Sequence, residues 1–128
     1  MTTSFPDQTS DAVGLISRWA HKISGLDGWT RRSVAVGAGV IAAAALPPVH
    51  ALPLLLISFP CFIWLIDGTP NWRRAFWVGW WFGLGHFAAG LYWIAHALVV
   101  DLRFAWLIPF AVLCIPAVIG LYIGVAAA

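Results

Sequence analysis

Two histidines lie within a long apolar stretch of this sequence, where an imidazole has few ordinary partners. Residues 75–100 contain no Asp, Glu, Lys or Arg, and His86 and His96 fall among them. Ionisable side chains in such a segment usually face a bundle interior, a cavity or one another. In a helix, these two histidines lie on neighbouring faces rather than on one face. We therefore expect His86 to be buried and hydrogen-bonded, and His96 to lie near an interface.

The remaining residues with reactive side chains do not form a recognisable catalytic set. Cys61 and Cys114 stand in separate apolar runs, and the sequence contains no glutamate. Neither thiol has a charged neighbour in sequence that would favour the thiolate, and the two cysteines lack metal-ligand spacing. We interpret both as small buried hydrophobic residues, and we predict no catalytic residue, metal site or cofactor in this chain.

The overall composition is that of a membrane protein. Of the 128 residues, 62% are hydrophobic and 9% are charged. Soluble domains, in contrast, have roughly 25% charged residues. The net charge of +2 is too small to indicate a nucleic-acid partner, and no basic cluster alternates with aromatic residues outside the apolar runs. The composition therefore predicts a protein that is integral to the membrane and does not bind nucleic acid.

Prolines and short polar turns divide the apolar part into segments. Residues 33–66 form a charge-free run of 34 positions. One helix of that length is too long for a span, because it rises about 1.5 Å per residue and the hydrocarbon core is about 30 Å thick. Pro47, Pro48 and Pro53 interrupt this run, since proline lacks the N–H that a helix interior needs. The sequence predicts an all-α, multi-pass transmembrane bundle of about four helices, with spans near 33–46, 53–66, 75–100 and 104–128.

The basic residues predict which ends of the spans face the cytoplasm. With the N-terminus inside, only Arg103 lies outside, and the other basic residues are cytoplasmic: Arg18, Lys22, Arg31, Arg32, Arg73 and Arg74. Residues 31–128 then form the membrane bundle, and residues 1–30 form a cytoplasmic tail. Apolar residues recur in that tail at helical spacing, which indicates an amphipathic interfacial helix over about 11–26. A solvated tail with a few apolar residues is the alternative.

Small residues recur at helical spacing through the third predicted span. Gly79 and Gly83 are four residues apart, and so are Gly85 and Ala89. This spacing lets two helix backbones approach closely, which matters in lipid because hydrophobic burial does not drive helices together there. The pattern predicts close helix packing. It also leaves open a second role, in which the missing side chains form a groove for an acyl chain.

Two motifs give the sequence a resemblance to a known family. One is Arg73-Arg74-Ala75-Phe76, then Gly79, Phe82-Gly83-Leu84-Gly85-His86-Phe87 and Gly90-Leu91-Tyr92-Trp93-Ile94. The other is Leu46-Pro47-Pro48 followed by Leu52-Pro53-Leu54-Leu55-Leu56. Through these motifs, residues 31–128 resemble the N-terminal membrane region of bacterial apolipoprotein N-acyltransferases.

The resemblance implies a multi-pass enzyme of the bacterial inner membrane that completes lipoprotein maturation. Such an enzyme transfers an acyl chain from a membrane phospholipid to the N-terminal diacylglyceryl-cysteine of an apolipoprotein. In the family, a cysteine nucleophile in a nitrilase-like domain forms a thioacyl intermediate, and neither Cys61 nor Cys114 matches it. This sequence shows no such domain. We therefore expect a truncated N-terminal membrane part that is inactive on its own.

Within this interpretation, one side of the third predicted span is the candidate contact for the lipid substrate. His86, Gly90 and Trp93 share a helical face, and Gly83 lies one turn before His86. We predict that these four residues line the lateral cleft that admits the acyl chain. Two other classes of function remain as alternatives: a small non-enzymatic membrane subunit or assembly partner, and a haem-binding electron carrier.

Overall fold

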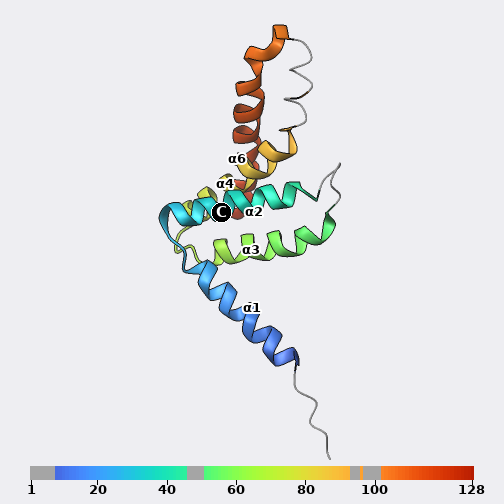
Figure 1. Cartoon of the computed structure of the whole chain (residues 1–128). Coiled ribbons are helices and arrows are strands. Elements are labelled where there is room, and N and C mark those ends of the chain that lie inside the picture. Colours follow the sequence, from blue (N-terminus) through green and yellow to red (C-terminus); the bar gives the residue numbers. More distant parts are fainter. Residues whose placement is uncertain (1–7, 46–50, 93–95, 97–101) are drawn as a thin grey trace, which may run out of the picture.

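The computed structural model describes residues 8–45, 51–92, 96 and 102–128, and the regular elements within these ranges are helical. They are α1 (Gln8–Ser24), α2 (Gly28–Ala43), the 3-10 turn η1 (Leu52–Leu54), α3 (Leu55–Asp67), α4 (Trp72–Gly90), the 3-10 helix η2 (Leu102–Leu107), the π-helical turn η3 (Phe110–Cys114) and α6 (Ile115–Ala127). Helices α2 and α3 lie side by side, α1 extends away from them, and α4 contacts both α2 and α6 (Figure 1). The predicted all-α class is confirmed for the described part of the chain.

Helices α2 and α4 differ from the helical segments predicted at 33–46 and 75–100. Helix α2 begins at Gly28, whose φ of 60° favours glycine, and not at residue 33. The first arginine pair therefore lies inside this helix. Helix α4 ends at Gly90 with Leu91 as its C-cap, so it does not continue unbroken to residue 100. A run without charges does not by itself keep a helix intact, and glycine has a low helix propensity.

One segment of the described residues is long and apolar enough to cross a membrane. It runs from Arg103 to Ala127, has 25 residues and a mean hydropathy of 2.4, and lies close to the predicted span 104–128. Residues 52–67 form a shorter apolar helical segment. One such helix is consistent with a membrane protein. The four spans and the cytoplasmic N-terminus stay predictions.

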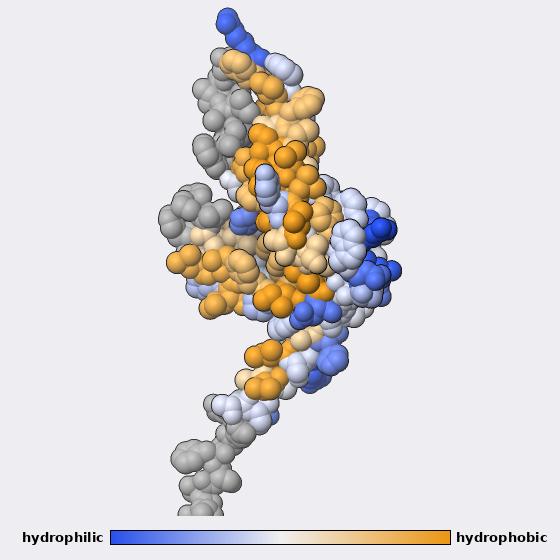
Figure 2. Space-filling view, turned by 180° about the vertical axis from the view of Figure 1, so that it is seen from behind, coloured by the Kyte–Doolittle hydropathy of each residue, from blue (hydrophilic) through white to orange (hydrophobic). Residues whose placement is uncertain are grey.

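Apolar side chains cover much of the molecular surface. Figure 2 shows this apolar surface on one side of the bundle, with hydrophilic residues gathered along one edge and at the upper end. Leu56 on α3 is 79% exposed and Val125 on α6 is 68% exposed. Helix α1 also exposes apolar residues, among them Val13 and Trp19. That exposure fits the predicted interfacial helix, which stays a prediction.

The two cysteines differ in their exposure. Cys61 on α3 is half-buried, whereas Cys114 in η3 is exposed. The prediction that both are buried was therefore wrong for Cys114. An apolar run in a sequence does not distinguish a position that contacts another helix from one that faces outward, because both are apolar in a membrane protein.

Helices α4 and α6 are antiparallel and touch backbone to backbone. A Cβ atom placed on Gly83 would lie 2.8 Å from the Cα of Gly120, and one placed on Gly79 would lie 3.0 Å from the Cα of Gly124. Glycines four residues apart on each helix make this approach possible. The close packing predicted for Gly79 and Gly83 is confirmed, and its partner is the glycine pair of α6.

Helix α4 makes an equally close contact with α2 on a second face. A Cβ atom on Gly39 would overlap the carbonyl oxygen of Phe82 and would lie 2.8 Å from the backbone nitrogen of His86. In the other direction, a Cβ atom on Gly85 would lie 3.0 Å from the Cα of Val36. Helix α4 is therefore held at backbone contact by two neighbours.

A small apolar core fills the space between α2, α3 and α4. Its buried residues are Ala35, Ala38, Ala42, Leu65, Val78 and Phe82. Phe62 of α3 stacks on Phe82 of α4, with ring centroids 4.1 Å apart. Buried Ser58 of α3 donates a hydrogen bond from its Oγ to the carbonyl oxygen of Ala38, at 2.5 Å. This bond joins α3 to α2 inside the core.

Replacing Ser58 by alanine should lower the free energy of unfolding by about 1 kcal/mol, because a buried carbonyl loses its second donor. The measurement is unfolding in SDS, followed by circular dichroism, of the protein purified in a mild detergent. Ser33 provides the control, since its exposed hydroxyl bonds only within α2, to the carbonyl oxygen of Trp29. Equal losses for Ser58→Ala and Ser33→Ala would contradict the role given to the buried bond.

Candidate functional site

The structure places the four predicted substrate-contact residues in different surroundings. Gly83 is buried and faces Gly120 of α6, whereas Gly90 is half-buried at the end of α4. His86 is half-buried on α4. Trp93 lies outside the described residues. The close contact of Gly83 with α6 shows a packing role, while the groove role predicted for these residues stays a prediction.

His86 lies among aromatic rings without a hydrogen bond to its Nδ1 atom. Its ring is parallel to that of Phe82, with centroids 6.3 Å apart, and meets Phe87 edge-on at 5.2 Å. The Nδ1 atom is buried and has no hydrogen-bond partner in the part of the chain that the structure describes. The expectation for His86 is therefore met in part: the half-buried imidazole has a backbone hydrogen bond with Gly39, whereas its Nδ1 atom has no described partner. An unpaired buried nitrogen costs about 1–3 kcal/mol, so a polar group of a ligand would be a favourable partner.

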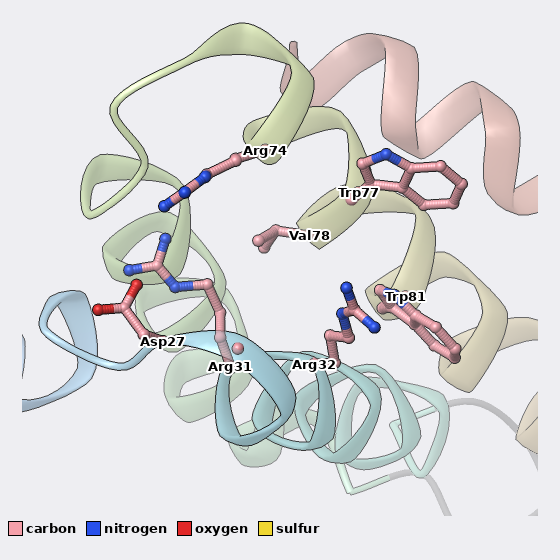
Figure 3. Close-up of a pocket in the computed structure, with 8 residues that line it drawn as sticks. Asp27, Arg31, Arg32, Arg74, Trp77, Val78 and Trp81 are labelled. Atoms are coloured by element: carbon pink, nitrogen blue, oxygen red, sulfur yellow. The ribbon is translucent and has the colours of Figure 1, made fainter.

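A second candidate site lies between the N-terminal parts of α2 and α4, and we call it the arginine pocket. It is a cavity of about 450 Å³ (Figure 3). Its lining residues are Asp27, Gly28, Arg31, Arg32, Arg74, Trp77, Val78 and Trp81. In the sequence, the two arginine pairs indicated orientation, and the second pair was part of a family motif, but neither pair indicated this cavity. One feature of the sequence could have indicated a shared basic site. Both arginine pairs precede charge-free runs, and both were predicted to lie on the cytoplasmic side of the membrane.

Arg31 is the buried arginine of the arginine pocket, with 7% of its surface exposed. Its Nε atom donates a hydrogen bond to the carbonyl oxygen of Leu26, at 2.6 Å. Its Nη2 atom donates to two further carbonyl oxygens, that of Ser24 at 2.8 Å and that of Gly68 at 2.9 Å. The ends of α1 and α3 meet here, because a Cβ atom on Gly68 would lie 2.7 Å from the Cα of Ser24. One guanidinium therefore joins the α1–α2 connection to the end of α3.

The matches to known proteins cover most of this chain. Residues 38–128 match the family model for the apolipoprotein N-acyltransferase N-terminal domain. The chain is 43% identical over 121 residues to the apolipoprotein N-acyltransferase of Allorhizobium ampelinum, covering 87% of this chain. It is 44% identical over 115 residues to that of Rhodopseudomonas palustris, covering 85% of this chain.

The apolipoprotein N-acyltransferase of Brucella melitensis is 42% identical over 123 residues, covering 88% of this chain. These matches span only 22% to 23% of the relatives' own length. No solved structure matches the chain. The extent of the family match and the level of identity establish that this chain belongs to the apolipoprotein N-acyltransferase family, of which it carries the N-terminal domain.

Proposed function

We propose that this chain forms the N-terminal membrane part of an enzyme that acylates lipoproteins in the bacterial inner membrane. The reaction transfers an acyl chain from a membrane phospholipid to the α-amino group of the N-terminal diacylglyceryl-cysteine of an apolipoprotein. The observation that carries this proposal is 43% identity over 121 residues to an enzyme named apolipoprotein N-acyltransferase. The apolar segment Arg103–Ala127 supports the membrane location.

The proposed topology has about four spans and a cytoplasmic N-terminus. Residues 1–30 form the cytoplasmic tail and residues 31–128 form the bundle. The basic residues near the starts of α2 and α4 support this orientation, because Lys and Arg are enriched in cytoplasmic connections. With α4 starting inside, its Gly90 end lies toward the outer side of the membrane.

The proposed contact with the acyl donor lies on α4, toward that outer end. Gly90, His86 and Trp93 form the wall of the cleft, and Gly83 lets α6 approach to form the adjoining part. The buried, unpaired Nδ1 atom of His86 supports a polar contact in the same region. The half-buried position of Gly90 supports a surface on which an acyl chain can lie.

A chimeric enzyme tests the proposed function. Residues 31–128 replace the corresponding N-terminal segment of the Allorhizobium ampelinum enzyme, in a bacterium depleted of its own apolipoprotein N-acyltransferase. Mass spectrometry of a reporter lipoprotein should then detect the added N-acyl chain, because the segment supplies equivalent helices. A chimera that reaches the membrane at the parent's level and leaves the reporter unacylated would contradict the proposal.

In this chimera, replacing Gly90 by leucine should slow acylation roughly tenfold at an unchanged protein level, because the added side chain displaces the acyl chain from its productive position. The measurement is the initial rate of reporter acylation, with membrane level followed by immunoblot. Gly37→Leu is the control, since a Cβ atom on Gly37 meets no other atom within 4 Å. Full activity of Gly90→Leu would remove Gly90 from the proposed cleft.

A further inference from the structure

The arginine pocket has a net positive charge, because its lining contains more arginines than carboxylates. Three guanidinium groups line it, those of Arg31, Arg32 and Arg74, against the single carboxylate of Asp27. Like charges from two helices repel when they share one cavity, and the repulsion grows where water is partly excluded. An anion between them would therefore lower the free energy of this arrangement.

Arg31 presents part of its guanidinium to the pocket in a fixed position. Its hydrogen bonds to the carbonyl oxygens of Ser24, Leu26 and Gly68 use Nε and Nη2. A guanidinium has five N–H donors, and Nη1 has no hydrogen-bond partner within the described ranges. Because the three acceptors are neutral, these hydrogen bonds do not cancel the positive charge. A guanidinium held in this way is suited to bind a phosphate group.

Arg32 and Arg74 approach the same cavity from different helices. In Figure 3, Arg74 of α4 points toward Arg31, and Arg32 of α2 lies beside Trp81. Both arginines lie near the N-terminal ends of their helices, which begin at Gly28 and Trp72. Backbone N–H groups and the helix dipole favour negative charge at such ends. Both side chains are exposed, so they can adjust around a bound anion.

The rest of the pocket favours a lipid over a free ion. Trp77, Val78 and Trp81 form its apolar part. By helical spacing, Trp77, Trp81 and Leu84 share a face of α4 that continues away from the pocket, through residues without charges. Tryptophan is enriched at membrane interfaces, and basic pockets between membrane helices bind anionic headgroups.

We propose that the arginine pocket binds the phosphate of an anionic phospholipid, whose acyl chains lie along the α4 face that starts at Trp77 and Trp81. A cavity of about 450 Å³ accommodates the headgroup, and the chains lie outside it. This site is separate from the acyl-donor cleft, because Arg74 and Gly90 stand at opposite ends of α4, on the order of 24 Å apart along its axis. It holds a lipid that is not consumed.

The test measures lipid binding to the native protein, as its own cell produces it. The protein is purified in a neutral detergent. Native mass spectrometry compares phosphatidylglycerol, which is anionic, with phosphatidylcholine, which is zwitterionic. The double variant Arg32→Gln/Arg74→Gln should weaken phosphatidylglycerol binding about tenfold or more, on the scale of two basic groups at an anionic surface. Phosphatidylcholine binding should change less than twofold.

The control is a second double variant with the same loss of charge, Arg18→Gln/Arg73→Gln. Neither of these residues lines the pocket, and Arg73 instead lies over the ring of Trp72, at 5.5 Å. The affinity of this control variant for phosphatidylglycerol should be within twofold of that of the parent. Circular dichroism should show unchanged helix content in both double variants.

Equal weakening by the two double variants would overturn the proposal, because it would show general charge attraction. Binding without preference for phosphatidylglycerol in the parent would overturn it as well. A third arm adds inorganic phosphate at the concentration of the lipid. Complete displacement of phosphatidylglycerol would assign the pocket to free phosphate instead. None of these measurements depends on acylation, so they are independent of the proposed enzyme activity.

Discussion

Replacing Gly39 by valine should lower the free energy of unfolding by about 3 kcal/mol, the upper part of the range for overpacked interiors. The new Cβ atom would overlap the carbonyl oxygen of Phe82 and would lie 2.8 Å from the backbone nitrogen of His86. These are backbone atoms in a helix, so they cannot turn away as a flexible side chain can. Helices α2 and α4 would have to separate, and their shared core would lose contact.

Unfolding in SDS, followed by circular dichroism, measures this loss for the protein in mild detergent. Gly37→Val is the control on the same helix, because a Cβ atom there has open space within 4 Å. It should change the unfolding free energy by less than about 1 kcal/mol, in either direction. Similar stabilities for Gly39→Val and Gly37→Val would show that the two helices are not at backbone contact.

Replacing Arg31 by alanine should also cost about 3 kcal/mol of unfolding free energy, because three carbonyl oxygens lose a charged donor. This one guanidinium donates hydrogen bonds to the carbonyl oxygens of Ser24, Leu26 and Gly68. The same SDS titration, without added lipid, measures the effect. Limited proteolysis should in addition cut faster near residues 24–28, since α1 is joined to α3 through this side chain.

Two variants separate geometry from charge at this position. Arg31→Lys keeps the charge but has one compact ammonium group in place of a planar fork, so it should recover less than half of the lost stability. Arg32→Ala removes an exposed arginine that lies over Trp29 at 5.0 Å, and it should cost about 1 kcal/mol or less. Full recovery by lysine would show that charge alone stabilises the region.

The sequence predicted the parts of the fold that depend on local chemistry. A span was predicted to start near residue 53, and the helical segment there begins with η1, which contains Pro53, followed by α3. The Gly79 and Gly83 pair was expected at a close contact, and the structure provides one. The partner helix was not predicted, because the spacing of two glycines on one helix does not identify the surface that meets them.

The start of α2 shows why the boundaries were harder to predict. Arg31 and Arg32 directly precede the predicted span 33–46, and an unpaired charge inside an apolar helix is costly. In the structure, Arg31 instead finds three carbonyl oxygens from α1, its connection to α2, and the end of α3. Those acceptors come from positions up to 37 residues away in sequence. Local pattern could not reveal that arrangement.

The candidate site was predicted in part for a similar reason. His86 was identified as an ionisable group in an apolar segment, and the structure shows a buried Nδ1 atom without a described partner. The arginine pocket was missed because placing both arginine pairs on one side of the membrane does not show that α2 and α4 pack against each other. That juxtaposition depends on the antiparallel packing of α2 with α3, which places Gly68 beside Arg31.

The glycine contacts on two faces of α4 also limit how this domain can move. With Gly39 against Phe82 on one face and Gly83 against Gly120 on another, rotation of α4 about its axis would drive side chains into neighbouring backbone. We therefore expect helices α2, α4 and α6 to move together as one unit. In the proposed enzyme, an opening that admits a lipid would then lie at the periphery of this unit rather than between these three helices.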